Sequence, residues 1–310
     1  MELVWIFAMV AGLVVAVVAS RAAVSRATTL AAGSRIPPFV IGITLLAIGT
    51  DLPEIANSIV SSIADHGDLN VGDSVGSAAT QVTLILGLLP FIVGPFIVGA
   101  RRVVGIGAVT VAALLLGAWL LSDGYLGRLD AVVLLVVWLV GSIIVWRGLP
   151  RGSEPAIRVD YGRKGRNIAE ALLAFALVGG GAVAALWGFV NLAERFDIPE
   201  YILAFFAASL GTSLPELIVN ITALRAGARD MAIGGVLGAS FVDSTLSIAA
   251  GPLIAPTVIS ADLAVLGSLL AAGAVAFAVL ILSRQERHTR VTGGLLLAVY
   301  AAFFFVLLLA

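Results

Sequence analysis

Long apolar runs recur along the whole chain and limit its fold more than any other feature. Each run has 18 or more residues, which is enough for a helix to cross the roughly 30 Å hydrocarbon core of a bilayer. Hydrophobic residues make up 60% of the sequence and charged residues only 12%, whereas a soluble domain carries about 25% charged residues. The sequence therefore predicts an all-α integral membrane protein in contact with the lipid bilayer.

Ten apolar segments can be drawn, and one polar stretch divides them into two groups of five. The segments cover about residues 3–20, 37–63, 70–89, 91–121, 128–146, 167–193, 198–224, 231–255, 260–283 and 291–310. The polar stretch 147–166 contains two prolines and several glycines, so it is interpreted as a linker between two five-helix repeats, 1–146 and 167–310. The first segment lacks a preceding basic region and a clean cleavage site, which favours a membrane helix over a signal peptide.

The basic residues indicate how the helices are oriented. The loops after the first, third, fifth, seventh and ninth segments hold 16 of the 18 Lys and Arg residues, and the other loops hold only Arg128 and Arg195. Because cytoplasmic loops collect Lys and Arg, these odd-numbered loops and the linker are expected to be cytoplasmic and both termini extracellular. The expected location is the plasma membrane, with multiple passes.

Composition excludes several kinds of site. The chain has no cysteine, which excludes disulfides, thiolate metal sites and cysteine catalysis. Both histidines, His66 and His288, fall in predicted loops, so a histidine-based metal site within the membrane is excluded. The formal net charge of −1 gives no indication of a nucleic-acid partner. An intramembrane aspartyl protease is disfavoured, because Asn70 stands where a Gly-x-Gly-Asp motif requires its first glycine.

A six-residue motif appears twice, once in each predicted repeat. Residues 49–54 read Gly-Thr-Asp-Leu-Pro-Glu and residues 211–216 read Gly-Thr-Ser-Leu-Pro-Glu, so five of the six positions are identical. Gly76 and Gly238 follow at the same distance from the two motifs. Five helices separate the copies, which inverts the second copy relative to the first. Inverted repeats with interrupted helices indicate a secondary transporter whose site lies near the membrane midplane.

The proline of each motif predicts a break that exposes backbone oxygens. Pro53 and Pro215 have no N–H, so the carbonyl four residues earlier in each segment loses its helical partner. Carbonyls around residues 47–50 and 209–212 are therefore expected to point at an ion or at water, because an exposed carbonyl within the membrane needs a partner.

Acidic side chains in the apolar segments complete a predicted cation site. Asp51, Glu54, Glu216 and Asp243 have no basic residue among them. A charge within the membrane costs several kcal/mol, so these acids are expected to bind cations, to take up protons, or to do both. Further oxygen ligands at helical spacing are Thr50, Thr212, Ser77 and Gln81. Carboxylate, hydroxyl and carbonyl oxygens are hard ligands that suit Ca²⁺ and Na⁺.

Four other polar residues have less specific expected roles. Asp73 lies near the start of its segment, where it either lines an entrance or has no role in the site. Asn57, Ser58 and Asn220 follow the motif glutamates by about a turn. They are expected either to hydrogen-bond between helices or to line the ion pathway.

These motifs together resemble the calcium/cation antiporter superfamily, in particular its sodium/calcium exchanger branch. The resemblance covers the whole chain and implies a transporter rather than an enzyme, with no cofactor besides the transported Na⁺ and Ca²⁺. It also implies four cation positions between the second, third, seventh and eighth helices, with the first and sixth helices sliding to switch access. By position, the implied Ca²⁺ ligands are Thr50, Glu54, Thr212 and Glu216, and the implied Na⁺ ligands are the carbonyls of Ala47 and Ser209 together with Ser77, Ser213 and Asp243.

Three departures from the pattern of this superfamily leave the coupling ion open. Asp51 and Ala239 replace serines, and Gln81 replaces an asparagine. Na⁺/Ca²⁺ exchange by alternating access is the first expectation. The alternative is an H⁺-coupled or K⁺-influenced antiporter of a divalent cation, Ca²⁺ or Mg²⁺, and a passive channel is a further possibility.

Overall fold

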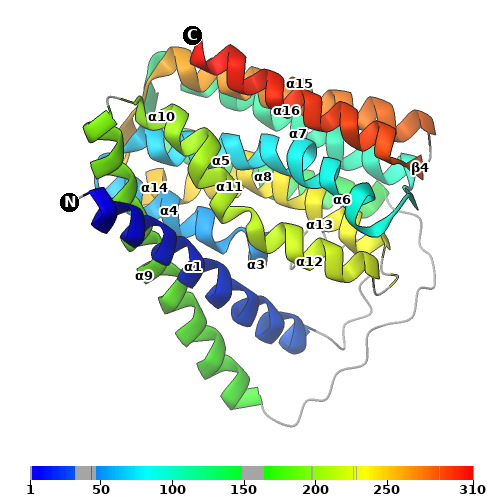
Figure 1. The fold of residues 1–310 in the computed structure, drawn as a ribbon, viewed down its shortest axis with the longest axis horizontal. Helices are drawn as coiled ribbons and strands as arrows, with labels where there is room; N and C mark the ends of the chain where they lie inside the picture. Colours follow the sequence, from blue (N-terminus) through cyan, green and yellow to red (C-terminus); the bar gives the residue numbers. More distant parts are fainter. Residues whose placement is uncertain are drawn as a thin grey trace.

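The computed structural model of the chain is a bundle of helices (Figure 1). It describes residues 2–31, 43, 47–148, 164–196, 198–225, 227, 229–285 and 287–309. Up to residue 148, the elements are α1 (Glu2–Ala31), α3 (Ala47–Thr50), α4 (Leu52–Ile63), α5 (Gly67–Thr80), the π-helical turn η2 (Gln81–Ile85), α6 (Leu86–Val93), β1 (Phe96–Ile97), α7 (Ala100–Leu120), the 3-10 turn η3 (Leu121–Asp123), β2 (Tyr125–Leu126) and α8 (Arg128–Gly148). From residue 164, they are α9 (Lys164–Phe196), α10 (Glu200–Leu203), the π-helical turn η4 (Ala204–Ala208), α11 (Ser209–Thr212), α12 (Leu214–Arg225), α13 (Arg229–Val242), the π-helical turn η5 (Asp243–Ser247), α14 (Ile248–Ile254), β3 (Thr257–Val258), α15 (Ala261–Gln285), β4 (Arg287–His288) and α16 (Arg290–Leu308).

Seven helical stretches among the described residues are long and apolar enough to cross a membrane. They begin at Gly67, Ala100, Arg128, Glu200, Arg229, Ala261 and Arg290. This agrees with the prediction of a helical, multi-pass membrane protein. Most of the predicted linker lies outside the described residues, as does the start of the second predicted segment.

Two predicted helix boundaries are wrong. The first segment is expected to end near residue 20, but α1 continues to Ala31. The sequence also suggests a division between the third and fourth segments at Pro90 and the Gly94-Pro95 pair, with the next segment beginning near residue 91. In the structure, α6 continues through Pro90 to Val93, and the chain turns at Gly94, whose φ of 81° suits glycine. The next helix, α7, begins only at Ala100.

Prolines within α6 and α14 are accommodated because distant side chains replace the hydrogen bonds that they remove. Pro90 and Pro252 cannot donate to the carbonyls of Leu86 and Ile248, four residues earlier. The Leu86 carbonyl lies 2.7 Å from Nε2 of His288. The Ile248 carbonyl accepts a hydrogen bond of 3.1 Å from Nδ2 of Asn70. Each bond joins the part of the chain before the linker to the part after it.

Acidification is expected to destabilise the protein through His288, which lies in the connection between α15 and α16. Burial lowers the pKa of its imidazole, because a charged ring would lose hydration. An unfolded histidine has a pKa of about 6.5, so below that pH the unfolded state binds the proton more readily than the folded state. Relative to a His288→Asn variant, the melting temperature of the wild-type protein in detergent should therefore fall as the pH drops from 7 to 5. The same pH dependence in both proteins would contradict the assignment.

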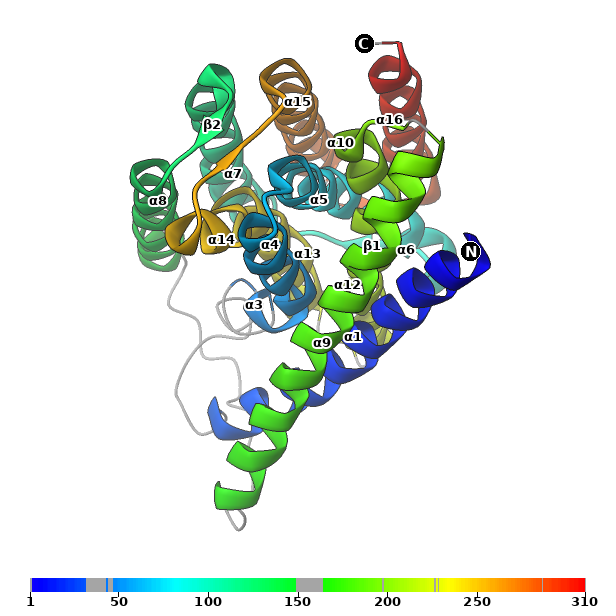
Figure 2. The same ribbon diagram turned by 90° about the vertical axis from the view of Figure 1, so that its left-hand side faces the viewer.

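Helices α5 and α13 lie within the bundle, whereas α1 and α9 pack against each other along one side of it and extend beyond it (Figures 1 and 2). Gly12 and Gly181 lie at the α1–α9 crossing, where a side chain on either would meet the other's backbone. Two short antiparallel pairs, β1 with β4 and β2 with β3, connect loops on opposite sides of the linker. The α1–α9 pair therefore lies on one side of the bundle, and the two strand pairs join loops in the rest of it.

Two glycines allow α5 and α13 to approach other helices closely. A Cβ atom at Gly76 would meet the backbone of Phe205 in η4, and one at Gly238 would meet the backbone of Ile43. The two contacts are equivalent in position within the two motif-bearing regions. Both glycines are therefore required where the site-bearing helices cross.

Candidate ion-binding site

Both motifs form the helix breaks that the sequence predicts. Helix α3 ends at Thr50 and α4 begins at Leu52, and Asp51 between them has φ −81° and ψ 9°. Ser213 separates α11 from α12 with nearly the same angles, φ −81° and ψ 4°. Pro53 occupies the first turn of α4, where a missing N–H costs nothing. The proline therefore starts a new helix rather than bending an old one.

The carbonyls of Ala47 and Ser209 are less free than the sequence suggests. The Ala47 carbonyl accepts hydrogen bonds from the Asp51 N–H at 2.9 Å and the Thr50 hydroxyl at 3.2 Å. The Ser209 carbonyl accepts from the Ser213 N–H at 3.0 Å. These two oxygens point along their own helices, so binding an ion would require a shared or broken hydrogen bond.

Four acidic side chains gather at the breaks. Asp51, Glu54 and Asp243 each offer a carboxylate oxygen within 4.8 Å of the others, and Glu216 lies beside Asp51 and Thr50. All four carboxylates are buried, at 1% exposure or less. Unit charges so close repel by about 3 kcal/mol per pair at an effective dielectric constant of about 20. Among the described residues, no Lys or Arg forms an ion pair with them.

Hydroxyl and amide groups join these acids across the helices. Ser77 Oγ donates to Glu54 Oε1 at 3.4 Å and lies 3.4 Å from Thr212 Oγ1. Gln81 Nε2 donates to Asp243 Oδ2 at 2.9 Å. Both Ser77 and Gln81 are fully buried. The structure therefore brings side chains from both motifs, from α5 and from the two π-helical turns η2 and η5 to one place.

Several buried oxygens around this place have no hydrogen-bond partner. They are Oδ1 and Oδ2 of Asp51, Oε2 of Glu54, Oε1 of Gln81, Oγ of Ser213, Oε1 and Oε2 of Glu216, and Oδ1 of Asp243. A buried oxygen without a partner is costly, and a group of them with no basic residue suits a bound cation. All are hard ligands of the type that Ca²⁺ and Na⁺ prefer.

Asp73 belongs to this network, although the sequence gives it only a possible entrance role. Its side chain is 1% exposed. Its carboxylate accepts hydrogen bonds from Asn57 Nδ2 at 2.7 Å and from Thr212 Oγ1 at 3.2 Å. Its spacing in the sequence could have predicted its helix face. Residues 73, 77 and 81 are four apart and so share one face of a helix.

Ala239 stands where the superfamily pattern has a serine, and its neighbour does not supply the missing hydroxyl. Ala239 is fully buried and has no oxygen in its side chain. The hydroxyl of the adjacent Ser240 donates to the Ala78 carbonyl at 3.0 Å, so it is directed at α5. Compared with the superfamily pattern, the chain therefore has a carboxylate in place of a hydroxyl at Asp51 and no side-chain oxygen at Ala239.

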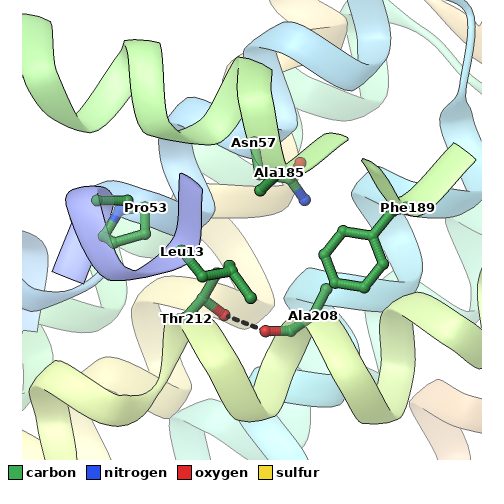
Figure 3. A pocket seen from close by; sticks show the side chains of 8 residues that line it. Leu13, Pro53, Asn57, Ala185, Phe189, Ala208 and Thr212 are labelled. Atoms are coloured by element: carbon green, nitrogen blue, oxygen red, sulfur yellow. Dashed lines mark hydrogen bonds between the residues drawn. The ribbon is translucent and has the colours of Figure 1, made fainter. Parts of the chain in front are cut away.

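A small pocket reaches the network from the side covered by α1 and α9 (Figure 3). Its cavity volume is about 10 Å³, which is room for about one water molecule. Its lining residues are Leu13, Ala16, Pro53, Asn57, Ala185, Phe189, Ala208 and Thr212. Asn57 and Thr212, the two hydrogen-bond donors to Asp73, lie in the wall of this pocket. The pocket therefore connects the crossing helices to the polar network.

Comparisons with known proteins identify the family of the chain. The family model for the sodium/calcium exchanger protein matches residues 4–147 and 168–309. The chain is 31% identical to the inner membrane protein YrbG of Escherichia coli over 80% of this chain and 79% of that protein. It is 25% identical to the sodium/calcium exchanger MaX1 of Methanosarcina acetivorans over 79% of this chain and 81% of that protein.

The fold is also similar to that of solved structures. The sodium-calcium exchanger NCX_Mj, soaked with Na⁺ and Sr²⁺, superposes with a TM-score of 0.68 at 25% sequence identity. The match covers 97% of this chain and 98% of that one. Since the family model matches nearly the whole chain, the chain belongs to the sodium/calcium exchanger protein family.

Proposed function

We propose that the chain is a secondary active cation antiporter that exchanges Na⁺ for Ca²⁺ by alternating access to one shared site. The observation that carries this proposal is the group of buried, unpartnered oxygens at two helix breaks, with no basic residue paired to them in the described part of the chain. Family membership and the exchanger and antiporter names of relatives such as MaX1 and the putative antiporter CaxA of Alkalimonas amylolytica support cation antiport.

The proposed architecture is ten transmembrane helices in two inverted repeats, residues 1–146 and 167–310, joined by the cytoplasmic linker 147–166. The elements around the two motifs support it, because they match in length. Helices α3 and α11 have four residues each, α4 and α12 have 12, and α5 and α13 have 14. A five-residue π-helical turn follows both α5 and α13, and such turns are frequent at functional sites.

Contacts between loops support the proposed assignment of the loops to two sides of the membrane. Arg102 pairs with Asp230, and both lie in regions assigned to the cytoplasm. On the side assigned to the exterior, Arg195 pairs with Glu2 at 2.8 Å and His66 with Glu200 at 3.0 Å. Each pair joins loops of the same predicted side. We propose that both termini are extracellular and that the protein lies in the plasma membrane.

The proposed Ca²⁺ position lies between the two breaks. Its ligands are Glu54 and Glu216 with the hydroxyls of Thr50 and Thr212. Further positions, for Na⁺, share the Glu54 and Glu216 carboxylates and add the remaining members of the predicted set: Asp51, Asp243, Ser77, Gln81 and Ser213, with the carbonyls of Ala47 and Ser209. The pocket beneath α1 and α9 is the proposed route of access, opened and closed as this helix pair slides.

Na⁺ loaded inside proteoliposomes is expected to drive Ca²⁺ uptake on dilution into Na⁺-free buffer. The physical reason is competition, since Na⁺ and Ca²⁺ would share the Glu54 and Glu216 carboxylates and could not occupy them together. The measurement is ⁴⁵Ca²⁺ uptake, with choline replacing Na⁺ inside the control vesicles. Equal uptake with Na⁺ and choline would refute Na⁺ coupling.

The second candidate is an H⁺-coupled or K⁺-influenced antiporter of Ca²⁺ or Mg²⁺. The observation that favours it is Asp51, a buried carboxylate with both oxygens unpartnered where the second motif has Ser213. A pH gradient imposed without any Na⁺ would then drive divalent uptake, and Asp51→Ser would weaken that coupling. Varying Na⁺, H⁺, K⁺, Ca²⁺ and Mg²⁺ singly in the same vesicles separates the two candidates. Ion flux without any counter-ion dependence would instead indicate a passive channel.

A further inference from the structure

Asp73 differs from the acids clustered at the helix breaks, because both of its carboxylate oxygens have hydrogen-bond partners. Oδ2 accepts from Asn57 Nδ2 at 2.7 Å, and Oδ1 accepts from Thr212 Oγ1 at 3.2 Å. Glu54 and Asp243, by contrast, each have a buried oxygen without a partner. To bind an ion directly, Asp73 would have to give up one of its bonds. Its arrangement therefore fits a residue that holds another side chain in place.

The hydroxyl of Thr212 has one proton, and several acceptors lie within its reach. The carbonyls of Ala208 and Ser209, earlier in the same segment, lie at 3.1 and 3.4 Å, and Figure 3 shows the bond to Ala208. The Asp73 carboxylate reaches the same hydroxyl from α5, at 3.2 Å. A carboxylate oxygen is a stronger acceptor than a backbone carbonyl, so the proton is directed toward Asp73.

The direction of this proton determines where the lone pairs of the Thr212 oxygen face. A hydroxyl accepts through its lone pairs and donates through its proton, so the proton of a hydroxyl that binds a cation must point away from the ion. Ser77, one helical turn after Asp73 on α5, places its Oγ 3.4 Å from Thr212 Oγ1 and donates to Glu54 Oε1. With its proton on the bond to Asp73, Thr212 keeps its lone pairs for the site that Glu54 borders.

Only one of the two motif threonines can be held in this way. The alignment of the two motifs pairs Asp73 with Gly235 and Asn57 with Val219. Neither Gly235 nor Val219 has a polar side chain, so no acid at position 235 can accept the proton of Thr50, the equivalent of Thr212. Asp73 and Asn57 therefore distinguish one half of the site from the other.

We propose that Asp73 is a positioning residue for divalent-cation binding, which accepts the Thr212 proton and so turns the Thr212 oxygen toward the ion. Asn57 holds the Asp73 carboxylate in place. The inference rests on the proposed function, because it takes Thr212 as an ion ligand. Removing the partner that orients a ligand typically weakens metal binding about 10–100-fold.

The test measures ⁴⁵Ca²⁺ binding to the full-length protein in detergent by equilibrium dialysis. Asp73→Leu removes the acceptor and should raise the Kd for Ca²⁺ about 10–100-fold. Asp73→Asn keeps a side-chain oxygen that can accept the Thr212 proton, and the Asn57 amide can turn to offer its own oxygen to the new amide. Most of the Ca²⁺ affinity should therefore be retained in Asp73→Asn.

A double-mutant cycle shows whether Asp73 acts through the Thr212 hydroxyl. In a Thr212→Val background, which lacks that hydroxyl, Asp73→Leu should cause no further loss of Ca²⁺ affinity. Thr110→Val is the matched control background, because it removes a buried hydroxyl that donates to the Ile106 carbonyl at 3.0 Å within α7. Asp73→Leu should keep its full effect there.

Equal losses in the Thr212→Val and Thr110→Val backgrounds would overturn the proposal, as would unchanged Ca²⁺ affinity in Asp73→Leu. Binding by Asp73→Asn as weak as that by Asp73→Leu would also overturn it, and this comparison decides the question if Thr212→Val binds too little Ca²⁺ to measure.

Transport by the wild-type protein in proteoliposomes separates this inference from the proposed function. Na⁺-dependent Ca²⁺ exchange, together with independent effects of the Asp73 and Thr212 substitutions, would refute the positioning role and leave the proposed function intact. Coupled effects of the two substitutions without Na⁺-dependent exchange would refute the Na⁺ coupling and support the role of Asp73.

Discussion

Replacing Glu54 or Glu216 with glutamine is expected to abolish Ca²⁺ exchange while leaving the protein folded. Each carboxylate is buried and has oxygens without hydrogen-bond partners, so an ion would lose a charged ligand that water cannot replace. Removing one partner of a buried charge pair costs about 2–5 kcal/mol, which corresponds to at least about a thirtyfold loss of Ca²⁺ affinity. The measurements are Ca²⁺ binding by calorimetry and ⁴⁵Ca²⁺ flux in proteoliposomes.

Stability measurements distinguish a lost ligand from a damaged fold. Glutamine has nearly the same volume as glutamate and removes repulsion among the clustered acids. The melting temperature without divalent ions should therefore stay the same or rise, and the increase on adding Ca²⁺ should disappear. Glu2→Gln is the matched control, because Glu2 is a half-exposed residue that pairs with Arg195. Normal Ca²⁺ transport by either Glu54→Gln or Glu216→Gln would refute the assigned site.

Adding a single methyl group at Gly76 or Gly238 is expected to destabilise the protein and disrupt the site together. A Cβ at either position would overlap a facing backbone atom, of Phe205 or of Ile43, and backbone cannot move aside as a side chain can. Overpacking typically costs about 1–3 kcal/mol, and helices α5 and α13 would have to shift. Such a shift would also displace Ser77, directly after Gly76, from Glu54.

Gly117 in α7 provides the matched control for these substitutions. A Cβ atom at Gly117 would have open space around it, with no heavy atom of a neighbouring element within 4 Å, and the residue lies in the interior of a helix. Alanine there should raise stability by about 0.5–1 kcal/mol, since glycine is the poorer helix former. Fluorescence-detected thermal unfolding in detergent would compare the three variants. A Gly76→Ala protein as stable as Gly117→Ala would show that the helices are not in contact at that glycine.

The local features of this protein follow from its sequence. Proline and glycine act on their own helix, so the breaks at Asp51 and Ser213 could be predicted from the motifs. Apolar length predicts membrane helices, and most predicted segments agree with the helices to within a few residues. Helix α6 continues through Pro90, and a distant group compensates the Leu86 carbonyl that the proline leaves without a helical partner. His288, far along the chain, lies within hydrogen-bonding distance of it.

The burial of the candidate ligands was easier to predict than their arrangement. Burial of an acid in an apolar segment could be inferred from composition, and Asp51, Glu54, Glu216 and Asp243 are all buried. The place of Asp73 in the network could not be inferred from the sequence, because the equivalent position in the other repeat carries no acid. Its contact with Thr212 joins residues from α5 and α11, and that proximity depends on how the helices cross.

The sequence by itself therefore determined the membrane helices, the two breaks and the identity of most buried acids. These depend on interactions within one helix or on transfer from water to lipid, which each segment undergoes separately. Only the tertiary structure decided which oxygens share one space, which carbonyls stay within their helices and which glycines must be glycine. Those properties depend on contacts such as Gln81 with Asp243 and Gly76 with Phe205, because small differences in helix crossing determine which distant groups meet.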